Sequence, residues 1–215
     1  MKRHSLTLKV LLFIGLTFLI KTVDAQNNAY KSVLANCLDQ HKILLDKTDC
    51  MNGVIAPDFI GSTIDGTTIQ LSKLKGQVVV LNFWFIACAP CRAEVPGLNE
   101  VVEKFKNKKV NFISIATDTE QELKKYLIKS KFSFETIADP AFLICQKKYD
   151  IRSYPTTIII DKNGKIRFYS VGGKVPQQDK NNNAFFPLAN KSNSDSIDKE
   201  IKDRLVPVIE ACLSK

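Results

Sequence analysis

The amino-acid sequence predicts an α/β fold, in which helices flank a central mixed sheet. Two apolar runs of strand length, residues 78–83 and 110–116, are typical of strands buried on both faces of a sheet. A helical pattern at 88–105 separates them. Near the end, Asn163-Gly164 forms a hairpin turn between strands expected at 156–161 and 165–171. Strands that alternate with helices and end in a hairpin indicate an α/β or α+β sandwich.

The composition is that of an ordinary globular protein with one domain of normal size. Of the 215 residues, 45% are hydrophobic and 25% are charged, which excludes wholesale disorder, collagen and coiled coil. The net charge is +9. The basic residues do not form dense runs with interleaved aromatics, as they do in nucleic-acid-binding proteins. We therefore expect no nucleic acid among the partners.

The first 25 residues have the order of segments found in a secretory signal peptide. A basic start is followed by an apolar run at 10–20 and by the small residues Val23 and Ala25. This run is too short to cross a bilayer, so we expect export, cleavage after Ala25 and no stable membrane span afterwards. An uncleaved signal that anchors the chain is the minor alternative. Residues 26–52 then form an N-terminal helical extension, and 53–215 form the main domain.

The remaining elements follow from periodicity and turn residues. Helices are expected at 30–47, from Thr119 to about residue 130, and at 140–149. The segment that opens at Thr119 has a capping box with Glu122. Short strands are expected at 67–71 and 135–138, and a polar insertion at about 172–194. An amphipathic C-terminal helix, which Pro207 can kink, is marked by apolar residues at helical spacing: Ile197, Ile201, Leu205, Val208 and Cys212.

Cys88 and Cys91 form a Cys-Ala-Pro-Cys motif where a buried strand gives way to a helix. The thiolate is the attacking species in redox chemistry, and a helix N-terminus stabilises it. We expect Cys88 to be the exposed attacking thiol and Cys91 its buried partner. A zinc site would need about four ligands, but the chain after residue 25 offers one histidine, His41, and no second such motif. No metal is expected, and a structural bridge this short would stabilise little.

Five segments, taken in order, resemble one family. They are Ala56-Pro57-Asp58-Phe59, Leu71-Ser72-Lys73-Leu74-Lys75-Gly76, Asn82-Phe83-Trp84, Cys88-Ala89-Pro90-Cys91-Arg92-Ala93-Glu94-Val95-Pro96 and Tyr154-Pro155-Thr156. The sequence resembles the TlpA/ResA-like branch of the thioredoxin superfamily, over about residues 53–171. The resemblance implies a thioredoxin-like fold and a secreted thiol–disulfide oxidoreductase without a cofactor. Ala87 departs from the family, which often has an aromatic residue before the first cysteine.

The resemblance also implies roles for residues around the cysteines. Glu94 would be a partly buried carboxylate with a raised pKa that exchanges protons with the thiols; an ordinary solvated glutamate is the alternative. Pro155 would be a cis proline facing the motif, with the backbone of Tyr154 pairing with a substrate peptide and Thr156 flanking it. Trp84 is expected to pack beside the site, with direct substrate contact as the lesser alternative.

Four further cysteines allow three pairings. A Cys37–Cys50 bridge is possible because a break in the helical pattern lies between the two residues. Cys145 and Cys212 both lie in apolar surroundings and resemble small buried hydrophobic residues.

The leading functional hypothesis is a reductase of disulfides in other exported proteins, re-reduced by an upstream electron-donor protein. Peroxiredoxins share the Ala56-Pro57-Asp58-Phe59 opening, so a peroxidase is an alternative. These enzymes need Thr or Ser three residues before the reactive cysteine, and here that residue is Phe85. A disulfide-forming oxidase is a further alternative, because reduction potentials in this fold range from about −270 to −120 mV. Oligomeric state and specific substrate do not follow from the sequence.

Overall fold

A computed structural model describes residues 27–37, 48–172 and 191–214 of the chain. The proposed signal peptide and most of the predicted polar insertion lie outside the described residues. The fold is built on a five-stranded sheet with the order β5-β4-β3-β6-β7. The strands are β3 (Val78–Trp84), β4 (Val110–Ala116), β5 (Glu135–Ala138), β6 (Thr156–Ile160) and β7 (Ile166–Val171). β3, β4 and β5 run parallel, whereas β6 is antiparallel to both β3 and β7, so the sheet is mixed.

The central strand β3 is buried along its whole length because both faces of the sheet are covered. Its alternate side chains enter two different hydrophobic clusters. Val79, Leu81 and Phe83 belong to one cluster, and Val78, Val80 and Trp84 to the other. This burial on both faces is the reason that the strand is a continuous apolar run in the sequence.

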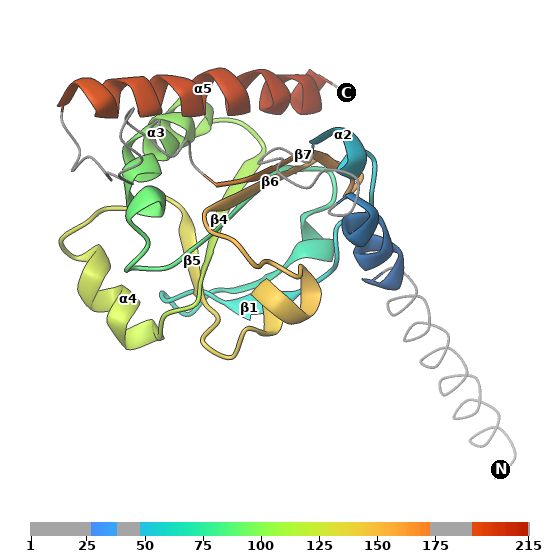
Figure 1. Ribbon diagram of the computed structural model, residues 1–215, viewed down its shortest axis with the longest axis horizontal. Helices are drawn as coiled ribbons and strands as arrows, with labels where there is room; N and C mark the ends of the chain where they lie inside the picture. The colour runs from blue at the N-terminus through green and yellow to red at the C-terminus, as the bar shows by residue number, and fades with distance from the viewer. Residues whose placement is uncertain (1–26, 38–47, 173–190, 215) are drawn as a thin grey trace, which may run out of the picture.

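Three helices cover the face of the sheet to which Trp84 points. They are α3 (Ala89–Phe105), α4 (Glu120–Leu127) and α5 (Lys191–Ser214), and α5 lies along α3 (Figure 1). The other face is covered by the helical residues 27–37, by α2 (Thr48–Met51) and by η2 (Leu143–Lys148). The result is the predicted arrangement of a mixed sheet between helices.

Several predicted elements differ from those observed. The 67–71 strand is β2 (Thr68–Gln70), which pairs with the unpredicted β1 (Ile60–Ser62) and leads into the 3-10 helix η1 (Leu71–Leu74). The helix predicted at 30–47 is observed over 27–37, and 38–47 lie outside the described residues. The segment 48–53, which was expected to break the helical pattern, contains the short helix α2 (Thr48–Met51). α5 begins at residue 191, inside the predicted insertion, and continues through Pro207.

The predicted helix at 140–149 is wrong in type and in its start. The observed element, η2, is a π-helix that begins at Leu143. Asp139 determines this start, because its carboxylate accepts the backbone N–H groups of Leu143, Ile144 and Cys145 at 2.8, 2.9 and 2.7 Å. An acidic group at the N-terminal end of a helix satisfies donors that have no partner inside the helix.

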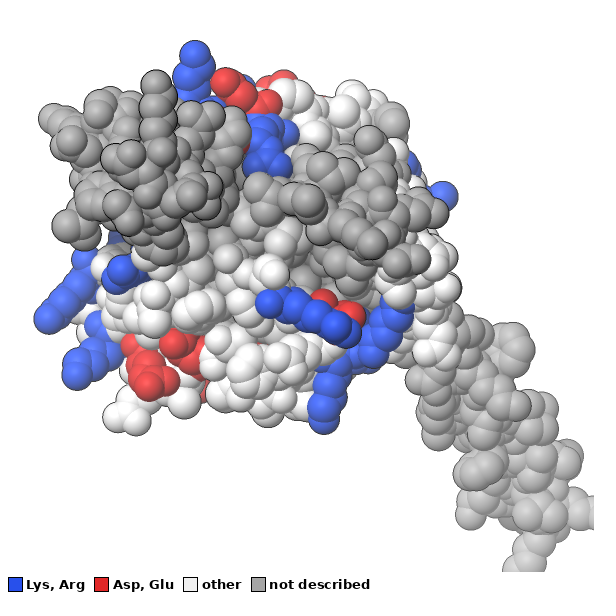
Figure 2. Space-filling model, viewed as in Figure 1, with Lys and Arg blue, Asp and Glu red and all other residues white. Residues whose placement is uncertain are grey.

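The visible face carries its basic side chains in separate groups, some with acidic residues beside them (Figure 2). Within the described part of the chain, no helix is both long enough and apolar enough to span a bilayer.

Candidate active site

The two motif cysteines lie at the beginning of α3, directly after β3 and a short loop. They are joined in a disulfide, with their Cα atoms 5.3 Å apart. Cys88 is the N-cap of the helix, and its sulfur accepts the N–H of Cys91 at 3.2 Å. The sequence therefore places Cys88 where unpaired helix N–H groups can stabilise a thiolate.

The expected contrast in exposure between the two cysteines is absent in this oxidised form. Cys88 is 5% exposed and Cys91 is 3% exposed. Both side chains belong to the hydrophobic cluster between the sheet and α3, which covers them. What distinguishes them is position: Cys88 lines an open groove at the surface, and Cys91 is not among its lining residues.

The loop before Cys88 is held by the loop that follows β4. Asp118 accepts the backbone N–H of Ile86 at 2.8 Å. Partial burial raises the pKa of Asp118, and the Ile86 N–H opposes that rise. Sequence reasoning missed Asp118. The sequence signal for Asp118 was its position just beyond the carboxyl end of a buried parallel strand. Ligand-binding loops gather there in α/β sheets.

The groove beside Cys88 has aromatic walls. It is formed by Phe85, Cys88 and neighbouring residues from one loop, and by Arg152, Ser153 and Tyr154 from another. The Phe85 and Tyr154 rings meet edge to face, with their centroids 5.4 Å apart. Neither Phe85 nor Arg152 was predicted as a groove residue. Phe85 directly follows β3, and its place in the loop that leads to Cys88 was the sequence signal for a groove residue.

The Tyr154–Pro155 peptide bond is cis. Tyr154 lines the groove, and among the described residues its backbone makes no hydrogen bond. The Pro155 carbonyl accepts the N–H of Gly172 at 2.7 Å. Thr156 is buried and its hydroxyl donates to the Ser153 carbonyl at 2.7 Å, so it supports this loop rather than lining the groove.

Trp84 lies in the core and not in the groove. Its ring is fully buried against Tyr126 and Phe132, at centroid distances of 6.0 and 5.6 Å. The suggestion that Trp84 contacts substrate directly is therefore wrong for this structure, because α4 and the segment after it cover the ring.

Glu94 is buried on α3, one turn beyond Cys91. Burial raises its pKa to about 8, against an opposing effect of Arg204 and with a smaller contribution from Glu200. A carboxyl in this environment holds its proton at neutral pH. Another buried polar residue, Asn82 of β3, does not titrate, and its amide donates to the Thr157 hydroxyl at 3.1 Å.

The other cysteines do not line the groove, although Cys145 lies against Tyr154, one of the groove residues. Cys37 and Cys50 form a second disulfide, with their Cα atoms 5.9 Å apart. Cys145 and Cys212 are buried in the two different hydrophobic clusters, on opposite faces of the sheet, and so do not pair with each other. Within the described residues, no group of three or more His, Cys, Asp or Glu side chains could hold a metal ion.

Comparison with known proteins places this site in a family. The sequence profile of the AhpC/TSA family matches residues 53–169, more than half of the chain. The chain belongs to the AhpC/TSA family. It is 34% identical over 134 residues to the thiol-disulfide oxidoreductase ResA of Bacillus cereus, which covers 62% of this chain and 77% of the relative. It is also 34% identical over 124 residues to the thioredoxin-like protein YneN of Bacillus subtilis, covering 56% and 71%.

Several solved structures share the fold. A crystal structure described as the thiol:disulfide interchange protein DsbE of Chlorobium tepidum matches with a TM-score of 0.55 at 26% identity, covering 74% of this chain and 97% of that one. The thioredoxin domain of a Bacteroides vulgatus thiol-disulfide oxidoreductase matches with a TM-score of 0.50 at 24% identity, covering 70% and 97%. The fold is thioredoxin-like, and this family member is a thiol–disulfide oxidoreductase of the ResA/DsbE type.

Proposed function

We propose that the Cys88–Cys91 pair is the redox centre and that it reduces disulfides in other exported proteins. The observation that carries this proposal is a Cys88–Cys91 disulfide at a helix N-terminus, with Cys88 lining an open groove. Of the two sulfurs, Cys88 is the one that a protein substrate meets first. The helix end favours its thiolate, which is the nucleophile in disulfide exchange.

The reaction starts from the reduced pair. The Cys88 thiolate attacks one sulfur of the substrate disulfide, forming a mixed disulfide and releasing the first substrate thiolate, which takes up a proton. Cys91, as thiolate, then attacks the Cys88 sulfur, closes the Cys88–Cys91 bond and releases the second substrate thiol. The substrate gains two electrons and two protons, and the enzyme loses them. An upstream dithiol protein must supply two electrons for the next cycle.

The substrate peptide would lie in the groove between Phe85 and Tyr154. The backbone groups of Tyr154 form no hydrogen bond within the described part of the chain, so they can pair with an extended peptide as an added strand. The aromatic walls can contact apolar side chains beside the target disulfide. Glu94 would exchange protons with the thiols during the two transfers, because its raised pKa lets it both hold and release a proton near neutral pH.

We further propose that the protein is exported, with residues 1–25 as a signal peptide that is cleaved to leave a protein free of the membrane. Residues 26–52 would be an extension to a thioredoxin-like domain at 53–215. The second disulfide, Cys37–Cys50, supports an oxidising compartment, where structural disulfides persist.

Turnover of two substrates tests the proposal. The reduced protein should reduce a peptide disulfide, and Cys88→Ser should abolish this activity, whereas reduction of hydrogen peroxide should be negligible because Phe85 stands where a peroxidase needs Thr or Ser. Faster turnover with peroxide than with the peptide would favour the peroxidase instead. Alkylation of the pair in living cells gives the direction of electron flow: a reduced steady state supports a reductase, and an oxidised one a disulfide-forming oxidase.

A further inference from the structure

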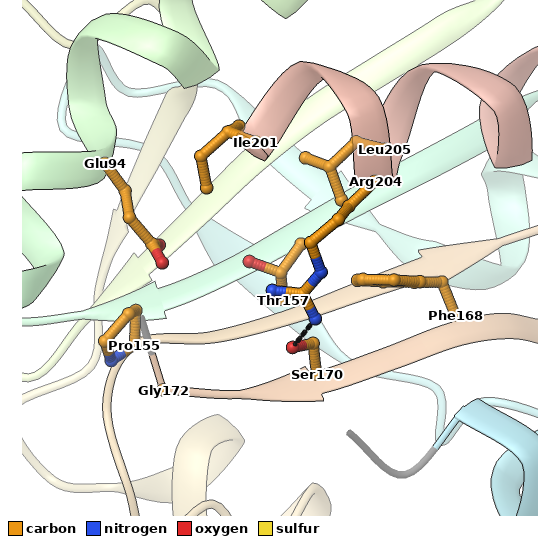
Figure 3. A pocket seen from close by; sticks show the side chains of 9 residues that line it. All are labelled: Glu94, Pro155, Thr157, Phe168, Ser170, Gly172, Ile201, Arg204 and Leu205. Atoms are coloured by element: carbon orange, nitrogen blue, oxygen red, sulfur yellow. Dashed lines mark hydrogen bonds between the residues drawn. The ribbon is translucent and has the colours of Figure 1, made fainter. Parts of the chain in front are cut away.

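A small, partly enclosed cavity is lined by Pro155, the residue next to Tyr154 of the groove. Glu94 lines it from α3, Arg204 from α5, and Thr157 and Ser170 from strands β6 and β7 (Figure 3). Its volume of about 10 Å³ is roughly the space of one water molecule. The cavity therefore brings a carboxyl of the proposed redox helix and a guanidinium of the C-terminal helix to the same small space.

The Arg204 side chain is held in place by the sheet. Its guanidinium donates a hydrogen bond to the Ser170 hydroxyl and lies over the Phe168 ring, 5.4 Å from the centroid. Figure 3 shows Glu94 and Arg204 entering the cavity from different helices. An arginine that is both hydrogen-bonded and stacked on an aromatic ring has few alternative orientations, so its charge stays beside the cavity.

We propose that Arg204 is a positioning residue of the redox centre: its fixed positive charge, acting across the cavity, governs when Glu94 ionises beside the Cys88–Cys91 pair. This inference rests on the proposed function. It assigns the C-terminal helix a part in the chemistry, although none of its residues lines the groove next to Cys88.

The two charged groups that act on Glu94 most strongly among the described residues, Arg204 and Glu200, both belong to α5. On α3, Cys91 precedes Glu94 by about one turn, and its thiol can ionise when the pair is reduced. The cavity-lining side chains of β6 and β7, Thr157, Phe168 and Ser170, carry no charge. Arg204 is thus the cation that opposes burial and Glu200, and it favours the ionised form of Glu94.

Removal of the Arg204 charge should therefore move the Glu94 titration to higher pH. In Arg204→Met, the midpoint followed by ¹³C NMR of the Glu94 carboxyl should rise by about 1 pH unit, a tenfold change in its acid constant. Arg204→Lys should restore most of the wild-type midpoint. Lys202→Met is the matched control, since it removes a cation from the same helix that pairs with the exposed Glu100; the midpoint should stay within about 0.2 unit.

The thiols provide a second readout in the reduced protein. The pH profile of Cys88 alkylation should change in Arg204→Met, but the double variant with Glu94→Gln should have the profile of Glu94→Gln alone, because the effect passes through the carboxyl. If Arg204→Met does not fold, Ser170→Ala releases the guanidinium without removing it and should raise the Glu94 midpoint by a smaller amount.

An unchanged Glu94 midpoint in folded Arg204→Met, or in Ser170→Ala where that variant is used, would overturn the proposal. An equal shift in Lys202→Met would overturn it too, because the effect would then be one of net charge. The carboxyl titration does not depend on turnover. Absence of disulfide reduction by the wild-type protein would therefore count against the proposed function and leave the titration interpretable.

Discussion

Gly97 lies where α3 packs directly against the backbone of α5, and Gly97→Ala tests this contact. A Cβ atom placed on Gly97 would lie 2.8 Å from the Cα of Asp198 and 3.2 Å from the Cβ of Ile201, both on α5. Carbon atoms in contact prefer about 3.5–4.0 Å. The nearest atom belongs to the backbone, so a side-chain rotation cannot relieve the overlap, and α5 must move by about 1 Å.

Two opposing effects set the magnitude. Alanine is favoured over glycine by about 1 kcal/mol inside a helix, whereas overpacking of a well-packed contact costs about 1–3 kcal/mol. A contact against backbone belongs at the upper end of that range, so we expect a net loss of about 1–2 kcal/mol in the free energy of unfolding. For a chain of this length, that lowers the melting temperature by about 2–8 °C.

Urea unfolding of the purified protein at constant pH measures this change, with Glu103→Ala as the control. Glu103 lies on the same helix, and its side chain is exposed and paired with Lys106. Loss of such a surface pair should cost less than about 0.5 kcal/mol. If Gly97→Ala is as stable as the wild type or more stable, helix propensity has outweighed packing and the close approach of α3 to α5 is refuted.

Four other outcomes are expected. Cys91→Ser should accumulate mixed disulfides through Cys88, detectable by mass spectrometry, and accumulation in Cys88→Ser instead would reverse the two roles. Glu94→Gln should remove an inflection near pH 8 from the pH profile of Cys88 alkylation. Because the pKa of Glu94 is raised in the folded state, the free energy of unfolding of the wild type should fall between about pH 4.5 and 8, and that of the variant should not show this fall. Tyr154→Ala should slow the reaction with a peptide disulfide roughly 2- to 10-fold but leave the rate with a small thiol reagent unchanged, since only the peptide needs the ring. Cys37→Ser should lower the free energy of unfolding by about 3 kcal/mol through loss of the N-terminal disulfide, which calorimetry would detect.

The parts of the fold that the sequence predicts well are those whose local pattern and tertiary role agree. The run at 78–83 corresponds to β3, and the helix predicted at 88–105 is α3 with Cys88 as its cap. The capping box at Thr119 is formed as expected. In each case the same residues that favour the element locally also bury its apolar face, so nothing competes with the local preference.

The observed elements differ from the predicted ones where a group that is distant in the sequence determines the structure. The start of η2 depends on three N–H groups that converge on one Asp139 carboxylate, and no periodicity encodes that convergence. β1 and β2 are three residues each, too short for an alternation to be recognised, and β1 is fixed by pairing and by contact with β5. Arg204 is a charged residue in an amphipathic helix, where solvent exposure is the ordinary expectation, and only the packing of α5 brings it to the cavity.

A row of residues one turn apart on α3 connects the proposed chemistry to the C-terminal helix. Cys88, Cys91, Glu94 and Gly97 follow one another at three-residue spacing, so each lies about one turn from the next in a row that winds around α3 from its N-cap. The first two are joined as a disulfide, the third is the buried carboxyl, and the fourth has no side chain where α5 crosses. A larger residue at the fourth position would hold α5 away from the carboxyl and the charge of Arg204 with it. Gly97 thus serves the proposed chemistry as well as packing, because it lets α5 come close enough for Arg204 to act on Glu94.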